Sequence, residues 1–213
     1  MTSNRIPERN RAGGGRLESV FGDLLVRRFI VRQPEMFRVV ETVLAQRLAS
    51  VDKAALCELA QTAMDIEYEG LDGDFLETGC GPGGAAIVIA HAKRRSRVLS
   101  LHPSSEPNAE MRVRRELAAH GVDERLNVRL VPGPYEETLA SDGVLALVHV
   151  GRVESGQIPV LLERLAPRLV SGGHLIVDDY RTQEECRQAV DDYFRGRGGF
   201  RLVRKSRLHV IKG

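Results

Sequence analysis

A glycine-rich turn between an apolar run and a helical segment constrains the fold of this 213-residue chain most strongly. The run 74–78 contains Glu77, the turn reads Gly79-Cys80-Gly81-Pro82-Gly83-Gly84, and the apolar segment 85–90 follows. Without a Cβ, glycine allows a tight turn and a ligand in contact with the backbone. The helix behind the turn would direct its unpaired N–H groups toward that ligand. The pattern predicts a nucleotide-type site, and its simpler alternative is a tight connection between strand and helix.

Apolar runs that predict strands alternate with segments of helical periodicity through the rest of the chain. The predicted strands are 74–78, 97–102, 127–131, 144–150, 174–177, 200–204 and 207–211. The predicted helices are 108–120, 135–140, 158–170 and 184–195, the third ending at a Ser171-Gly172-Gly173 cap. We expect an α/β fold, with a Rossmann-like, doubly wound sheet of seven strands, mostly parallel with an antiparallel C-terminal hairpin. Ligands bind such sheets at the carboxyl ends of the strands.

The N-terminal part differs in character from this alternating region. Residues 1–16 are polar and glycine-rich, which predicts a disordered tail. Residues 17–69 predict three helices, with Pro34 between the first two and Asp52 as the N-cap of the third. This extension either packs across the edge of the core or forms a lid over the substrate. Residues 70–213 then form the ligand-binding domain.

Composition argues against several classes of partner. The net charge is +2, tryptophan is absent, and no basic stripe is interleaved with aromatic residues, so we expect no nucleic acid. Cys57, Cys80 and Cys186 have no metal-binding spacing and suit a reducing compartment. No apolar run approaches the roughly 18 residues of a membrane span, and no signal peptide is evident. We expect a cytoplasmic protein that acts on a small molecule.

Two groups of motifs resemble known enzymes. Glu77 followed by Gly79-x-Gly81-x-Gly83 resembles motif I of class I methyltransferases that use S-adenosylmethionine (SAM), and residues 165–180 resemble the helix, Gly-Gly turn and fifth strand of that class. Residues 70–79, 134–139, 178–180 and 186–193 resemble, more specifically, the macrocin O-methyltransferase family. The similarity covers about residues 55–213. It implies SAM-dependent methylation of a hydroxyl on a small, glycosylated secondary metabolite, a role in antibiotic biosynthesis, and a homo-oligomer.

The resemblance also implies roles for individual residues. The predicted cofactor-binding residues are Glu77, Gly79, Gly81, Gly83, His102 and Tyr135. Methyl transfer is an in-line displacement, so a base must take the proton of the aligned hydroxyl, and Asp179 and His149 are the candidates. The family's Mg²⁺ would be held by an acid after strand four and by Asp178 and Asp179 after strand five. The alternatives are a structural role for Glu77, a turn acid at Asp179, a core histidine at His149 and core packing for Tyr135.

The chain departs from the family at two places. Gly151 and Val153 stand where acids follow strand four, and His102 replaces the acid that would bind the ribose hydroxyls. These departures leave a metal-independent enzyme open. They also motivate an alternative, a non-catalytic module that keeps the fold and assembles with an active partner. A nicotinamide-dependent oxidoreductase is a third possibility, although its glycine spacing differs.

Overall fold

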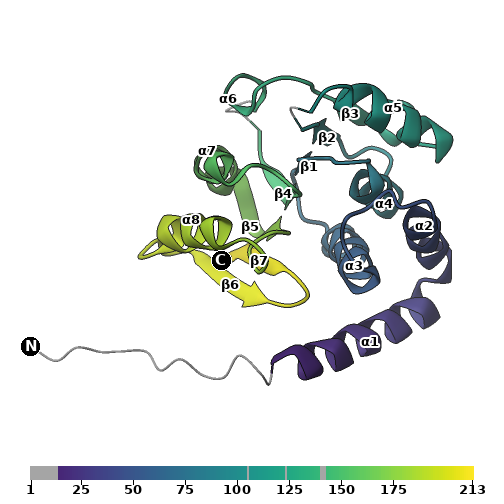
Figure 1. Ribbon diagram of the computed structural model, residues 1–213, viewed down its shortest axis with the longest axis horizontal. Helices are drawn as coiled ribbons and strands as arrows, with labels where there is room; N and C mark the ends of the chain where they lie inside the picture. The colour runs from purple at the N-terminus through teal and green to yellow at the C-terminus, as the bar shows by residue number, and fades with distance from the viewer. Residues whose placement is uncertain (1–13, 105, 123, 140–142) are drawn as a thin grey trace, which may run out of the picture.

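The computed structural model describes residues 14–104, 106–122, 124–139 and 143–213 (Figure 1). Most of the predicted disordered tail, residues 1–13, lies outside the described residues. The first helix, α1 (Gly14–Arg32), begins three residues earlier than the periodicity predicted.

The described residues contain a seven-stranded sheet, which confirms the predicted fold class. Its strands are β1 (Asp74–Thr78), β2 (Leu99–His102), β3 (Val128–Leu130), β4 (Leu145–Val150), β5 (Leu169–Val177), β6 (Phe200–Arg204) and β7 (Leu208–Lys212). They are arranged in the order β3-β2-β1-β4-β5-β7-β6, with β7 antiparallel to β5 and β6. The order reverses between β1 and β4, so the carboxyl ends of these two strands form the crevice where such sheets bind ligands.

Helices cover both faces of the sheet (Figure 1). The remaining helices are α2 (Pro34–Ala45), α3 (Lys53–Glu69), α4 (Gly84–Ala92), α5 (Ala109–Ala119), α6 (Tyr135–Thr138), α7 (Ile158–Leu165) and α8 (Glu184–Phe194). Side chains alternate between the two faces along each strand. Phe75 and Leu147 therefore belong to the core under α2, α3 and α4, whereas Leu76 and Val148 belong to the core under α6, α7 and α8.

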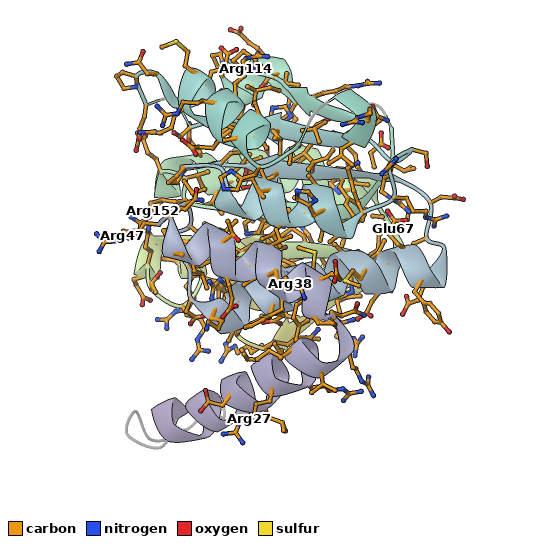
Figure 2. The ribbon with its side chains drawn as sticks, turned by 90° about the vertical axis from the view of Figure 1, so that its right-hand side faces the viewer. Arg27, Arg38, Arg47, Glu67, Arg114 and Arg152 are labelled. Atoms are coloured by element: carbon orange, nitrogen blue, oxygen red, sulfur yellow. The ribbon has the colours of Figure 1, made fainter. Side chains whose placement is uncertain are left out.

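The third N-terminal helix has the caps that the sequence predicted. Asp52 Oδ1 accepts a hydrogen bond from the Ala55 N–H at 2.8 Å, and Gly70 ends α3 in the left-handed conformation with φ of 70°. The buried residues Val43 and Leu56 join α2 and α3 to the same core as the sheet. Phe29 of α1 is also buried in this core, while α1 itself lies along the edge of the molecule, where Figure 2 labels the exposed Arg27. Each described helix is too short or too polar to cross a membrane.

One predicted boundary is wrong. The sequence predicts a helix over residues 158–170 that is capped at Gly172 and Gly173, but α7 ends at Leu165 and β5 already begins at Leu169. Pro167 lacks the N–H that would continue the helix. Gly172 has φ of 80°, and a Cβ on Gly173 would lie 2.9 Å from the Val170 oxygen. The two glycines therefore form an irregularity within β5 rather than a helix cap.

Candidate active site

The glycine loop after β1 is tight where it meets protein and open beside Gly81. Gly79 has φ of 64°, and a Cβ there would lie 2.5 Å from the Arg152 oxygen, so this position requires glycine. Gly83 also adopts a left-handed conformation, with φ of 99°. A Cβ on Gly81 would meet nothing within 4 Å. Gly81 therefore borders space into which a ligand can fit, as the sequence pattern predicted for a binding loop.

Glu77 brings an unpaired carboxylate oxygen to this loop. The side chain is buried, and Oε2 has no hydrogen-bond partner among the described residues. Its Oε1 lies 3.7 Å from His149 Nδ1, too far for a hydrogen bond. A buried ionised carboxylate is costly without a partner. Its position at the strand crevice thus suits a ligand that carries a positive charge.

His149 lies beside Glu77 in the next strand, in direct register with it. Its Nε2 lies 3.2 Å from Asp178 Oδ1. Although burial lowers the pKa of His149, Asp178 and then Glu77 raise it to about 10. The raised pKa favours the imidazolium form at neutral pH, in which both ring nitrogens are donors.

Asp178 follows β5 and is held by two cations. Its Oδ1 accepts hydrogen bonds from His149 and from Arg207 Nε, the latter at 2.8 Å. Burial raises the pKa of Asp178, but His149 and Arg207 together hold it below its ordinary value. Glu77, His149, Asp178 and Arg207 thus form a row of alternating charges at the carboxyl ends of β1, β4 and β5.

Asp179, the predicted base, faces its own turn. Its Oδ1 accepts from Thr182 Oγ1 at 3.1 Å and its Oδ2 from Gln183 Nε2 at 2.9 Å. This is the arrangement of a turn-capping acid, the alternative that the sequence left open. Asp178 and Asp179 therefore have separate sets of partners.

His102 and Tyr135 contact the glycine loop or its neighbours from the α6 side of the sheet. His102 Nδ1 lies 3.2 Å from Thr138 Oγ1, and burial, with Arg168, lowers the pKa of His102 to about 4. The Tyr135 hydroxyl accepts a hydrogen bond from the Gly79 N–H at 3.0 Å. Burial raises the pKa of Tyr135 to about 12. Both side chains are neutral, and Tyr135 fixes the loop directly.

Three residues at this site, Glu58, Arg207 and His209, had no assigned role in the sequence. Glu58 of α3 and His209 of β7 line a small cavity together with His149, Asp178 and Arg207. Glu58 Oε1 lies 2.8 Å from His209 Nε2 without the alignment of a hydrogen bond, and Glu58 Oε2 accepts from the Ser206 N–H. The available signal was weak: an acid within the apolar run 54–60 and a histidine within the apolar strand 208–211.

The residues present do not fit the Mg²⁺ ion that the family resemblance implies. Among the described residues, no group of three or more histidine, cysteine, aspartate or glutamate side chains is placed to hold a metal. Asp178 is engaged by His149 and Arg207, and Asp179 by its own turn.

Comparison with known proteins supports the motif resemblance. The family model described as Macrocin-O-methyltransferase (TylF) matches residues 105–200, which confirms the resemblance over that segment. An 8-demethyl-8-(2,3-dimethoxy-alpha-L-rhamnosyl)-tetracenomycin-C 4'-O-methyltransferase of Streptomyces olivaceus is 35% identical over 161 residues, which are 62% of this chain and 61% of the relative. A demethyldecarbamoylnovobiocin O-methyltransferase of Streptomyces niveus is 28% identical, with 63% of each chain covered. This chain thus spans less than two thirds of the length of these relatives.

A solved structure supports the fold. The O-methyltransferase TomG of Streptomyces achromogenes, involved in tomaymycin synthesis and determined in complex with SAM, aligns with a TM-score of 0.60 at 16% identity. The alignment covers 93% of this chain and 96% of that one. At this identity, the similarity establishes the Rossmann-like architecture alone.

Proposed function

We propose that this chain is a SAM-dependent O-methyltransferase that acts on a hydroxyl of a small, glycosylated secondary metabolite. The observation that carries the proposal is the unpaired, buried Glu77 oxygen beside the open face of Gly81, at the switch point between β1 and β4. The family match over residues 105–200 and the methyltransferases of tetracenomycin and novobiocin support the reaction class and the class of substrate.

The cofactor would be held by the loop and by Glu77. SAM supplies a methyl group on a positively charged sulfur and carries an ammonium group. Glu77 Oε2 would accept a hydrogen bond from that ammonium and offset positive charge in a dry site. Gly81 would let the cofactor lie against the backbone, while Gly79 and Gly83 hold the turn that makes this possible. His102 and Tyr135 would support the loop from the opposite side of the sheet.

Asp178 is the base that the geometry favours. Its Oδ1 is occupied by His149 and Arg207, whereas Oδ2 has no hydrogen-bond donor among the described residues. Asp178 Oδ2 would take the proton of the substrate hydroxyl as that oxygen bonds to the methyl carbon and the carbon–sulfur electron pair returns to sulfur. His149 would orient the carboxylate, since as an imidazolium it cannot itself take the proton. Asp179 retains the predicted role only if its turn opens.

The first test is calorimetric titration of the protein with SAM and with S-adenosylhomocysteine. The variant is Glu77→Gln, which removes the charge and keeps the shape, and the control is Glu69→Gln, an exposed acid on α3. A hydrogen bond to a charged group contributes about 1.5–3 kcal/mol, so Glu77→Gln should weaken SAM binding by roughly 10- to 150-fold. Glu69→Gln should bind as the parent protein does. If the unmodified protein binds neither ligand at millimolar concentration, the enzyme proposal fails.

The second test separates the two aspartates by turnover. A panel of polyketide glycosides with free sugar hydroxyls would be incubated with SAM and examined by mass spectrometry for a gain of one methyl group. Loss of a general base costs about 10²- to 10⁴-fold in rate. Asp178→Asn should fall in this range, and Asp179→Asn should lose far less. The reverse order would restore Asp179 as the base.

The alternative function is a non-catalytic module that retains the fold. It is favoured by the replacement of acids at His102 and Gly151. It predicts cofactor binding, or none, with no methyl transfer to any member of the panel.

We also infer a cytoplasmic homo-oligomer in an antibiotic pathway, for which the three buried free cysteines and the family resemblance are the support. Light scattering of the purified protein tests the oligomeric state.

A further inference from the structure

We propose that Arg207 supplies the positive charge beside Asp178 that a divalent ion would otherwise supply, so that the substrate site of this chain is metal-free. This inference rests on the proposed methyltransferase function and assigns Arg207 as a positioning residue within it. Arg207 comes from the turn between β6 and β7.

Packing explains why an acid is missing after β4. The Gly151 N–H donates to the Thr78 oxygen at 3.0 Å, which joins the end of β4 to the end of β1. A Cβ on Gly151 would lie 3.0 Å from the Gly79 oxygen and 3.1 Å from the Thr78 oxygen. A carboxylate at this position would therefore be crowded against two carbonyl oxygens. The segment after β4 seals the glycine loop, and neither Gly151 nor Val153 offers a carboxylate to a cation.

The Arg207 guanidinium is fixed where it can replace an ion. β7 begins at Leu208, which pairs with Val177, so the hairpin turn lies directly beside Asp178. The Arg207 oxygen accepts from the Lys205 N–H at 2.8 Å, and Arg207 Nη1 donates to the Ser206 oxygen at 3.3 Å. The side chains of Arg207 and Asp178 are only 13% and 11% exposed. A buried guanidinium with a direct hydrogen bond is a fixed cation rather than a surface charge.

The Arg207 guanidinium on Asp178 opposes a second cation at the same place. An ion that approached Asp178 Oδ1 would meet the two donors that already occupy it. Like charges within a few ångströms repel strongly in a buried site. Asp178 Oδ1 is therefore closed to a metal ion, and Oδ2 keeps its lone pairs for the substrate proton.

The test measures metal binding first, independently of turnover. The unmodified protein, with and without S-adenosylhomocysteine, would be titrated with Mg²⁺ and with Mn²⁺ by calorimetry. We expect no binding at millimolar metal, and equal activity in EDTA and in Mg²⁺. Metal binding that is lost in Asp178→Asn would overturn the proposal. If instead the proposed methyltransferase function is wrong, neither the unmodified protein nor any variant should bind the cofactor, a result distinct from metal binding.

The second experiment removes the Arg207 side chain and then adds free guanidinium ion to the solution. Arg207→Ala should lower the melting temperature and kcat, with little change in SAM affinity. Millimolar guanidinium should partly restore the melting temperature and kcat of this variant, whereas ammonium should restore neither. Arg207→Lys keeps the charge and should retain intermediate activity. Arg201→Ala, which removes an exposed arginine from the same hairpin, should behave as the parent protein. An Arg207→Ala protein that equals the parent in both properties without guanidinium would refute the assignment.

Discussion

His149 should make the folded protein less stable as pH rises from neutral. Its ordinary pKa is 6.5, and in the folded protein Asp178 and Glu77 overcome burial and raise the pKa to about 10. Between these two values the folded state holds a proton that the unfolded state has released. The stabilisation from His149 is therefore complete below pH 6.5 and is lost progressively as pH rises through about 10.

The magnitude follows from the proton difference. One extra proton bound in the folded state changes the free energy of unfolding by about 1.4 kcal/mol per pH unit. From pH 6.5 to about 8, His149 should thus contribute a loss of about 2 kcal/mol, equivalent to roughly 4–8 °C in melting temperature for a protein of this size. Other titratable groups change the stability of the protein at the two ends of this pH range. The pKa values of His102 and His174, lowered to about 4 mainly by burial, add stability as pH rises toward 6.5. Burial lowers the pKa of Lys93 to about 8, which adds stability above that pH.

The assay is urea unfolding of the parent protein and of His149→Gln over this pH range. The difference between the two proteins isolates His149, because His102, His174 and Lys93 are common to both. The stability advantage of the parent should fall by about 1.4 kcal/mol per unit. His91→Gln, which removes an exposed histidine, should keep the parent's slope.

Parallel slopes for the parent and His149→Gln would refute this reasoning. His149 would then be a neutral imidazole in the folded protein, able to act as the base that the sequence predicted. If His149→Gln does not fold, proton NMR of the parent answers the same question, since the ring protons of His149 should not titrate near neutral pH.

Three further substitutions distinguish residues that bind the cofactor from residues that stabilise the fold. Gly84→Ala should unfold the loop region, because its Cβ would lie 2.5 Å from the Leu48 oxygen, and urea unfolding should show a loss of more than about 1 kcal/mol. Gly81→Ala should leave stability within about 0.5 kcal/mol and weaken SAM binding in calorimetry, since its Cβ would enter open space. Asp52→Ala removes the α3 cap and should cost about 1 kcal/mol in urea unfolding without changing SAM affinity.

Local pattern was sufficient to predict most of the fold. Strands buried on both faces appear as apolar runs, and caps such as Asp52 and Gly70 act within a few residues of their partners. The error at Gly172 and Gly173 arose because the same dipeptide serves as a helix cap or as a strand irregularity. The choice depends on pairing with β4, which residues 158–173 alone do not encode.

The site was predictable where a motif carries it and unpredictable where the fold assembles it. Glu77 and its glycines are contiguous, so their spacing identified them. Arg207 is 29 residues from Asp178, and Ser206 is 148 residues from Glu58, so neither pairing leaves a signal in a single sequence. The same effect occurs at Glu67 of α3, which is labelled in Figure 2. Its carboxylate pairs with Arg97 at 2.6 Å across 30 residues of sequence and helps to join α3 to the start of β2.

The missing acid at position 151 and the arginine at position 207 are two parts of one electrostatic arrangement. An additional carboxylate after β4 would leave the row of Glu77, His149 and Asp178 with excess negative charge, which a metal ion could neutralise. With glycine at 151, that carboxylate is absent, and the hairpin supplies a positive charge to Asp178 through Arg207. A metal ion added beside Asp178 would be repelled by the Arg207 guanidinium, which is already in contact with that carboxylate. Substitution of Arg207 therefore has its direct effect on Asp178, and substitution of Glu77 has its direct effect on the cofactor.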